Sequence, residues 1–270
     1  MASPAHKATS VRPAAPVALL VLAGIGATFF VVPLLGLVLR TPWGATWDQL
    51  RSPEVLTALR LSLLASVSAT AIALALGVPL AWTLARLTFP GRAVLRAVTV
   101  LPMVLPPVVG GVALLLAFGR SGLFGGWLAT AFGVHLPFTT AGAILAETFV
   151  AMPFLVITVE AGLRSMDTRF EDAARTLGAS RWTVLWRVTL PLIRPSLVAG
   201  AVLCWARALG EFGATITFAG NFPGRTQTMP LAVYLALETN PDAAIVLSLV
   251  LLAVSLAVLI GLRDRWLGSS

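Results

Sequence analysis

The sequence predicts an all-α, polytopic membrane protein, and three observations support this class. Of its 270 residues, 58% are hydrophobic and only 11% are charged, whereas a water-soluble domain carries about 25% charged residues. Four uncharged runs, at 17–39, 61–85, 97–119 and 243–262, each hold 20 or more residues. At about 1.5 Å per helical residue, each run reaches about 30 Å, the thickness of a bilayer's hydrocarbon core. Because peptide groups in lipid must be hydrogen-bonded within the chain, we expect these runs to be helices.

Two further predicted spans contain charged residues. One covers about 138–163 and holds Glu147 and Glu160, and the other covers about 195–219 and holds Arg207 and Glu211. Together the six predicted transmembrane helices form a domain at 17–262, surrounded by lipid. The first run is longer than the core of a secretory signal, about 7–15 residues, so we interpret it as a retained anchor. Residues 1–16 are rich in Ala and Pro and are expected to be disordered.

The distribution of Lys and Arg predicts the orientation of the chain. With both ends in the cytoplasm, thirteen of these side chains lie in cytoplasmic segments and five lie outside. Such an excess marks the cytoplasmic side, so we expect the tails 1–16 and 263–270 to lie inside a bacterial inner (cytoplasmic) membrane. The excess positive charge, a net charge of +8, is concentrated in these loops and tails. Because this distribution is a topology signal, nucleic-acid binding is not expected. On the outer side, the uncharged stretch 226–237 is too short to span and predicts a re-entrant or surface helix.

The sequence offers little for catalysis or metal binding. Cys204 is the single cysteine, and His6 and His135 lie in different predicted loops, which excludes an internal disulfide and a Cys/His metal cluster. A nucleotide-binding phosphate loop requires the pattern G-x-x-x-x-G-K-[ST], but the single lysine, Lys7, lies in the N-terminal tail. We therefore expect no catalytic residue, metal site or cofactor in this chain, and any ATP to be hydrolysed by another polypeptide.

A polar segment at 164–194 interrupts the apolar pattern between the fourth and fifth spans, on the predicted cytoplasmic side. Its pattern predicts a short helix, a glycine break and a second helix. Gly178 can adopt the positive φ that ends the first helix, and Ser180 can cap the second. Pro191 and Pro195 are expected to end the second helix and lead into the next span.

This segment resembles the EAA loop of the permeases of ATP-binding-cassette (ABC) importers. That motif runs Glu-Ala-Ala, three residues, Gly, nine residues, Ile, any residue, Leu-Pro. The matching positions here are Asp172, Ala173, Ala174, Gly178, Val188, Leu190 and Pro191, with the shorter Asp in place of Glu and Val in place of Ile. The resemblance implies the type I ABC-importer permease fold, in which 164–194 is a cytoplasmic coupling loop whose short helix sits in a cleft of a separate ATPase subunit.

The resemblance also implies partners and cofactors. The partner ATPase binds ATP and Mg, and an extracytoplasmic binding protein delivers the solute. Because an ATPase pair has two clefts and one chain has one coupling loop, the resemblance implies two permease chains, most simply a homodimer. The arginines of the loop either pair with acids of the ATPase or only enforce topology: Arg164, Arg169, Arg175 and Arg181.

A second informative stretch follows in the fifth span. Arg207 and Glu211 are four residues apart and so lie on one face of a helix. Charges within a membrane usually face a bundle interior or a wet cavity, so the pair either forms a gate or packs helices together. The candidate pathway or gate residues are Arg207, Gly210, Glu211, Gly213, Thr215 and Thr217. For Glu147 and Glu160, both a conduit role and structural pairing remain open.

Longer stretches resemble the molybdate permeases among the ABC importers. They are LGEFGATITFAGN followed by PGRTQTMPLAVY, and LPMVLPPVVGG followed by GRSG. The resemblance implies import of molybdate, and with it tungstate, by alternating access. One alternative is a sulfate or thiosulfate permease, which shares the Gly-Glu-Phe-Gly core. Another is a proton-coupled secondary anion transporter that uses Glu147, Arg207 and Glu211, although the sequence lacks the related halves typical of that class.

Overall fold

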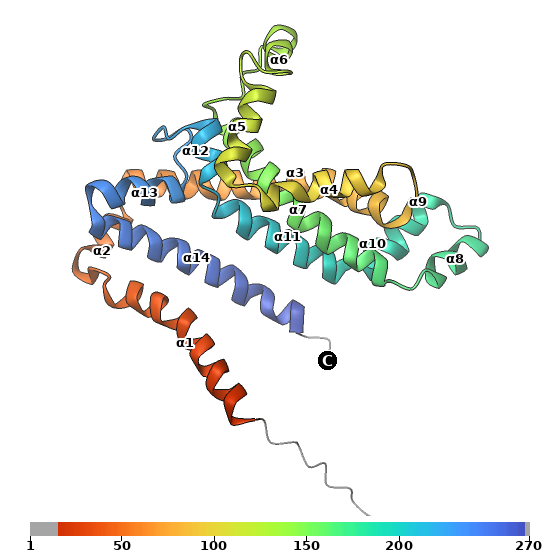
Figure 1. Cartoon of the computed structure of the whole chain (residues 1–270), viewed down its shortest axis with the longest axis horizontal. Coiled ribbons are helices and arrows are strands. Elements are labelled where there is room, and N and C mark those ends of the chain that lie inside the picture. The colour runs from red at the N-terminus through yellow and green to blue at the C-terminus, as the bar shows by residue number, and fades with distance from the viewer. Residues whose placement is uncertain (1–15, 268–270) are drawn as a thin grey trace, which may run out of the picture. The chain divides into compact units, whose positions relative to one another are not determined.

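The computed structural model describes residues 16–267, with side chains from 16 to 260, and every regular element in this range is a helix (Figure 1). The chain divides into two compact units, 1–41 and 42–270. Helix α1 (Val17–Leu39) of the first unit coincides with the first predicted span. The predicted disordered tail at 1–16 lies outside the described residues except for Pro16, and so do the last three residues of the predicted tail 263–270.

The second unit contains all the other described helices. In chain order they are α2 (Trp43–Leu50), α3 (Pro53–Arg86), α4 (Arg92–Val104), α5 (Pro107–Phe118), α6 (Gly125–Phe132), α7 (Thr140–Ser165), α8 (Arg169–Thr176), α9 (Arg181–Val184), the π-helix η1 (Leu185–Thr189), α10 (Leu190–Leu192), α11 (Arg194–Leu209), α12 (Gly213–Ala219), α13 (Met229–Thr239) and α14 (Pro241–Leu267).

Four described helices are long and apolar enough to cross a membrane, namely α1, α3, α7 and α14. Helices α3 and α14 cover the predicted spans at 61–85 and 243–262 and extend beyond them. Helix α7 begins and ends two residues later than the span predicted at about 138–163. Helix α3 begins earlier because the hydroxyl of Ser52 accepts a hydrogen bond from the N–H of Val55 and Pro53 occupies the first turn, two features that favour a helix start.

The two remaining predicted spans are not continuous helices. The span at 97–119 is divided between α4 and α5, because Leu105 and Pro106 have extended backbones with ψ of 138° and 132°. A residue that precedes a proline disfavours helical ψ, and here Pro106 and Pro107 follow one another. The span at 195–219 is divided between α11 and α12 at residues 210–212. Helix α5, at about 18 Å, is too short to cross a bilayer alone, so six crossings remain a prediction.

The predicted short helix at 226–237 begins three residues later, as α13. Before it, the N–H groups of Arg225, Thr226 and Gln227 all point to the carbonyl of Phe222 in a tight turn. Met229 then begins the helix, and its N–H donates to the hydroxyl of Ser62 on α3 at 2.6 Å. One side of α13 is buried against α3 and α14, whereas the side with Leu235 and Leu237 is exposed.

The main core lies where α3, α7 and α11 pack together. Small residues of α3 face larger apolar residues of α7, which lets the two helices approach closely, as is common in membranes. A Cβ added at Gly77 of α3 would lie 3.1 Å from a methyl group of Leu155. The fully buried members of this core include Ala69, Ala73, Ala81, Leu155, Val159, Cys204 and Ala208.

A second close contact joins the half-helices α5 and α12. A Cβ added at Gly111 would lie 2.6 Å from the Cβ of Thr217 and 3.0 Å from the carbonyl oxygen of Ala214. A Cβ added at Gly213 would lie 2.8 Å from the Cβ of Pro107. Only residues without a Cβ allow the two backbones to come this close, so the two broken segments support one another.

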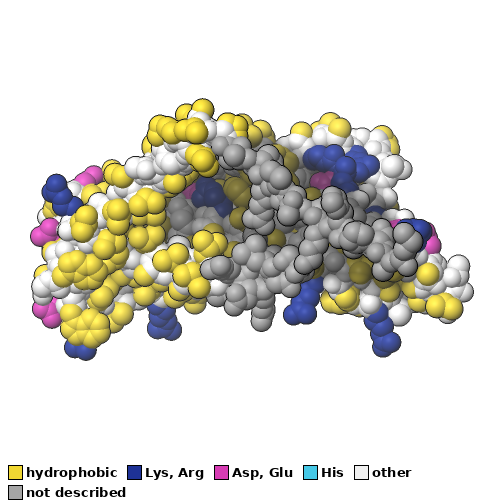
Figure 2. Space-filling model, turned by 90° about the horizontal axis from the view of Figure 1, so that it is seen from below, with side chains coloured by type: hydrophobic (Ala, Val, Ile, Leu, Met, Phe, Trp, Pro, Cys, Tyr) yellow, Lys and Arg dark blue, Asp and Glu magenta, His cyan; other side chains and the backbone are white. Residues whose placement is uncertain are grey.

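The surface is that of a membrane protein. Figure 2 shows broad areas of hydrophobic side chains on one face of the molecule. Large apolar residues such as Leu56, Val67 and Leu76 on α3 are more than half exposed. Exposed apolar surface of this extent needs lipid or protein against it.

We predict that Gly111→Ala lowers the stability of the protein by about 2 kcal/mol, because the new methyl group overlaps α12 and forces the helices apart. The thermal unfolding midpoint of the detergent-purified protein measures the effect. Gly126→Ala is the matched control, since its Cβ would lie 3.6 Å from the nearest carbonyl oxygen. Equal midpoints for the two variants would show that the α5–α12 contact is not tight.

Candidate functional site

The segment 164–194, for which we keep the name coupling loop from its predicted role, begins with a short helix closed at Gly178. Helix α8 ends at Thr176, Leu177 is its C-cap, and Gly178 has a φ of +84°, as predicted. The N–H of Gly178 donates to the carbonyl of Arg175 at 2.9 Å, and that of Ala179 donates to the carbonyl of Ala174 at 3.1 Å. This pair of bonds is the Schellman motif, which satisfies the last carbonyls of a helix. Gly178 therefore fixes the direction in which the chain leaves α8 toward α9.

The second half begins where predicted but ends later. The hydroxyl of Ser180 accepts a hydrogen bond from the N–H of Thr183 at 3.1 Å and caps α9. The expected end at Pro191 is wrong, because Pro191 lies inside α10 and the break falls at Ile193. A π-turn precedes the proline, with the N–H of Leu190 bonded to the carbonyl of Leu185. The wider turn makes room for a ring that would otherwise strain the helix.

Beyond Ile193 the chain bends into the next helix. The axes of the segments 181–192 and 194–209 meet at 71°. Pro195 lies in the first turn of α11, a position where a missing N–H costs nothing. The coupling loop therefore enters α11 through a sharp elbow instead of a straight continuation.

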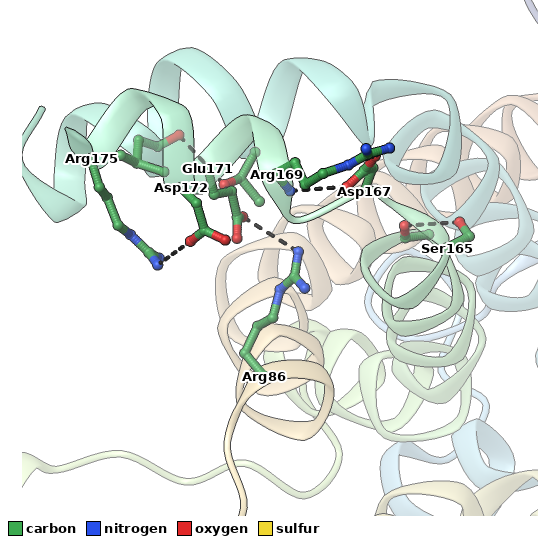
Figure 3. Close-up of polar contacts among 10 residues, drawn as sticks. Arg86, Ser165, Asp167, Arg169, Glu171, Asp172 and Arg175 are labelled. Atoms are coloured by element: carbon green, nitrogen blue, oxygen red, sulfur yellow. Dashed lines mark hydrogen bonds and ion pairs between the residues drawn. The ribbon is translucent and has the colours of Figure 1, made fainter. Parts of the chain in front are cut away.

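Glu171 joins both halves of the coupling loop to the rest of the unit. Its carboxylate is only 8% exposed, and one oxygen, Oε1, accepts a hydrogen bond from the hydroxyl of Thr189 at 2.6 Å. The same oxygen lies 3.4 Å from a guanidinium nitrogen of Arg86, near the end of α3. Figure 3 shows Glu171 directed toward Arg86. These contacts, which we call the Glu171 clamp, tie together α8, η1 and α3.

The sequence analysis missed this residue because the EAA pattern begins one position later, at Asp172. Asp172 is largely exposed and pairs only with Arg175 on its own helix, at 3.3 Å. Glu171, one residue earlier, is on the inner face of the same helix. The signal in the sequence was that Glu171 directly precedes the motif and so lies about a quarter of a helical turn from the exposed Asp172.

The outer face of the coupling loop is exposed and apolar. Leu177 is 89% exposed, Trp182 is 70% exposed and Trp186 is 65% exposed. The small residues Ala173 and Gly178 are also exposed. Of the other motif residues, Leu190 packs against the main core, Val188 and Ala174 are half-buried, and Pro191 is exposed.

Three of the six arginines of the coupling loop form ion pairs among the described residues, Arg175 with Asp172 being one of them. Arg164 lies 2.9 Å from Glu160, and Arg169 lies 2.6 Å from Asp167. Hydrogen bonds from Arg169 hold the pKa of Asp167 below its usual value. Arg181 is exposed and forms no ion pair among the described residues.

Glu160 belongs to a second cluster of charged residues, at the C-terminal end of α7, next to the coupling loop. Both Arg96 and Arg164 pair with its carboxylate. Arg92 donates through Nε to the carbonyl of Leu84 at 3.0 Å, and Arg96 and Arg164 also approach that carbonyl. Because the last carbonyls of a helix lack partners, these arginines close the end of α3. Of the two hypotheses for Glu160, structural pairing is observed.

The predicted ion pair between Arg207 and Glu211 is present, but not on one continuous helix. Helix α11 ends at Leu209, and Glu211 lies in the break before α12. Its Oε2 is 2.6 Å from Arg207, and its Oε1 accepts a hydrogen bond from the N–H of Ala214 at 2.7 Å. Glu211 is 1% exposed, whereas the side chain of Arg207 is 27% exposed. The carboxylate thus neutralises the arginine and caps α12 at once.

The other candidate pathway residues lie around this break. Gly210 is exposed at the end of α11, and Gly213 is buried against α5. Thr217 donates its hydroxyl to the carbonyl of Gly213, whereas the buried hydroxyl of Thr215 has no hydrogen-bond partner among the described residues.

Glu147 faces this region from α7. It is buried, and its Oε2 lacks a hydrogen-bond partner among the described residues. It lies within range of Coulomb repulsion from Glu211. The structure therefore places a second, unpaired acid near the buried pair.

Residues 73–269 match the family described as "Binding-protein-dependent transport system inner membrane component". The chain belongs to this family. This inner membrane component is 48% identical over 242 residues to the "Molybdenum transport system permease protein ModB" of Mycobacterium tuberculosis, covering 89% of this chain and 90% of that protein. It is 44% identical to the Escherichia coli protein of the same name, over 78% of this chain and 92% of that one. The E. coli "Sulfate transport system permease protein CysT" is 37% identical to it, over 86% of this chain and 85% of that protein.

The fold of this inner membrane component is that of ABC transporter permeases. A solved bacterial ABC transporter that imports alginate aligns with a TM-score of 0.75 at 18% identity, covering 94% of this chain and 96% of that chain. The all-helical, membrane-embedded architecture predicted from the sequence is thereby confirmed. At 18% identity, this structural similarity establishes the fold alone.

We predict that Glu171→Ala loosens the coupling loop, because it removes the acceptor for both Thr189 and Arg86. Amide hydrogen exchange across 169–192 should become about tenfold faster, the effect of losing about 1.4 kcal/mol of local stability. Asp172→Ala is the matched control, since its exposed pair with Arg175 is worth little. Unchanged exchange in the Glu171 variant would contradict the clamp.

We predict that Glu211→Gln destabilises the protein by about 2 kcal/mol, because it leaves a partly buried Arg207 without a counter-charge. Thermal unfolding in detergent provides the measurement. The double variant Arg207→Gln with Glu211→Gln should recover part of the loss, since no unpaired charge is left. A double variant as unstable as the sum of the two single variants would show that the ion pair has no coupling energy.

Proposed function

We propose that this chain is the permease of an ABC importer that carries molybdate, and with it tungstate, into the cell. The observation that supports the transport class most directly is the exposed, rigid coupling loop at the end of α7. Similarity to proteins named as molybdenum permeases over most of the chain supports the substrate. The sulfate relative shares less identity, so sulfate is the second candidate substrate.

The coupling loop supplies a surface for a separate ATPase. The indole rings of Trp182 and Trp186 and the side chain of Leu177 offer exposed apolar area. Fully desolvated aromatic side chains are typical of the residues that dominate protein interfaces. We expect ATP and Mg to bind that ATPase, and this chain to supply no catalytic residue.

The Glu171 clamp can transmit movement of the coupling loop to the helices of the membrane domain. Movement of α8 by the ATPase would be passed to the end of α3 through Arg86, and to η1 through Thr189. Because α3 packs closely along α7 and α11, these helices would move as one body. The elbow at Ile193 is where the loop can turn relative to α11.

The break between α11 and α12 is the proposed gate region. One polar group there, the Thr215 hydroxyl, has no partner among the described residues and can donate a weak, replaceable hydrogen bond to a passing oxyanion. One coupling loop per chain fits two chains, most simply a homodimer with the pathway between them. In this proposal the coupling loop and both chain ends are cytoplasmic, and a binding protein docks on the opposite side.

Uptake of labelled molybdate and sulfate tests the function. The chain would be expressed with its ATPase and binding protein in cells that lack other importers of these anions. We expect molybdate uptake that stops when ATP is depleted and persists when the proton gradient is collapsed. Preferential uptake of sulfate would overturn the substrate, and uptake that follows the proton gradient would overturn the ABC mechanism.

We predict that Gly178→Leu abolishes at least nine-tenths of uptake, about a tenfold loss, while the protein still inserts. A side chain at a φ of +84° is strained by about 1–2 kcal/mol and protrudes into the docking surface. Gly91→Leu is the matched control, because Gly91 has a φ of +87° in the short turn between α3 and α4 with open space around it. If both variants transported equally, Gly178 would not be a point of force transmission.

A further inference from the structure

A hollow of about 550 Å³ lies at the start of α7, within the range of small-ligand sites. Three separate connections meet there. Arg120 follows α5, His135 and Phe138 precede α7, and Arg225 lies in the turn between α12 and α13. We call this hollow the outer pocket.

The outer pocket and the coupling loop lie at opposite ends of α7. The hydroxyl of Thr139 lines the pocket and caps the first turn of α7 by accepting from the N–H of Gly142. The helix then runs 26 residues to Ser165, about 39 Å, before the coupling loop begins. With the coupling loop in the cytoplasm, the pocket opens on the side where a binding protein releases solute.

The outer pocket carries positive charge that the chain does not neutralise. Arg120 and Arg225 are exposed, and neither forms an ion pair among the described residues. Its lining contains no Asp or Glu. A concave surface with low-dielectric walls focuses such charge and raises the local concentration of anions. A guanidinium also presents a fork of N–H donors that matches an oxyanion.

The pocket walls are held in place by bonds between the connections. The carbonyl of Arg225 accepts a hydrogen bond from the hydroxyl of Thr140 at 2.8 Å. The rings of Phe138 and Phe222 meet edge to face, 6.1 Å apart. Phe138 has a φ of +61°, a conformation that a bulky residue adopts only where its surroundings enforce it. These contacts therefore fix the backbone of the connections that line the pocket.

We propose that the outer pocket captures a tetrahedral oxyanion carrying two negative charges as it leaves the binding protein, before it enters the pathway. This inference rests on the proposed function and extends it to a site. Two arginines and the N–H of an imidazole supply donors for several oxygens, and their exposure keeps binding weak enough for release. A concavity enclosed by three connections suits a small free anion better than the flat docking of an acidic protein surface.

Equilibrium binding of labelled molybdate to the purified permease–ATPase complex, without binding protein, tests the pocket. Arg120→Gln and Arg225→Gln should each weaken binding about tenfold and raise the KM for uptake by a similar factor, with the maximal rate unchanged. Arg60→Gln, an exposed arginine on α3 that forms no ion pair among the described residues, is the matched control. It should alter neither quantity.

Three results separate the possibilities. Molybdate binding that is unchanged in both pocket variants overturns the proposal. If the variants weaken docking of the binding protein but leave anion binding intact, the pocket is a contact for carboxylates of that protein and the proposal is also overturned. If the wild-type importer carries sulfate instead, the substrate assignment fails, but sulfate binding that is weakened by the same variants still supports the pocket.

Discussion

The close packing of α7 against α3 is the contact on which the rest of the structure depends. Ala69, Ala73 and Ala81 of α3 are fully buried in the core that this helix shares with α7 and α11, and Gly77 lies against Leu155 and Val156 of α7. Without water to drive burial, helices in a bilayer gain most from this close van der Waals contact. Helix α11 then packs against both. Each functional feature is attached to an end or a side of this bundle.

The helix breaks are held by polar groups of the chain itself. A peptide group freed in a membrane must find a partner, and the carboxylate of Glu211 accepts from Ala214 where α12 begins. At the other break, Gly111 lets α5 come against α12. The two interruptions thus lie side by side and stabilise one another. This arrangement concentrates irregular backbone and buried charge in one region, the region proposed above as the gate.

Charged residues at the end of the bundle that carries the coupling loop make structural contacts. Arg92, Arg96 and Arg164 close the end of α3 by donating to the carbonyl of Leu84, and Glu160 neutralises two of them. A few residues away, Glu171 binds the coupling loop to the same helix end. The positive charges that orient a membrane protein during insertion here also build the joint through which force would travel.

By itself, the sequence determined the helical membrane class, the corner at Gly178, the cap at Ser180 and the pairing of Arg207 with Glu211. These features depend on apolar run length or on spacings of a few residues, so local geometry decides them. Only the tertiary structure decided that Glu171, and not Asp172, faces inward, that the span at 195–219 is broken, and that Arg120 and Arg225 share a pocket. Those outcomes depend on which helix end or backbone comes within a few ångströms, and no spacing along the chain contains that information.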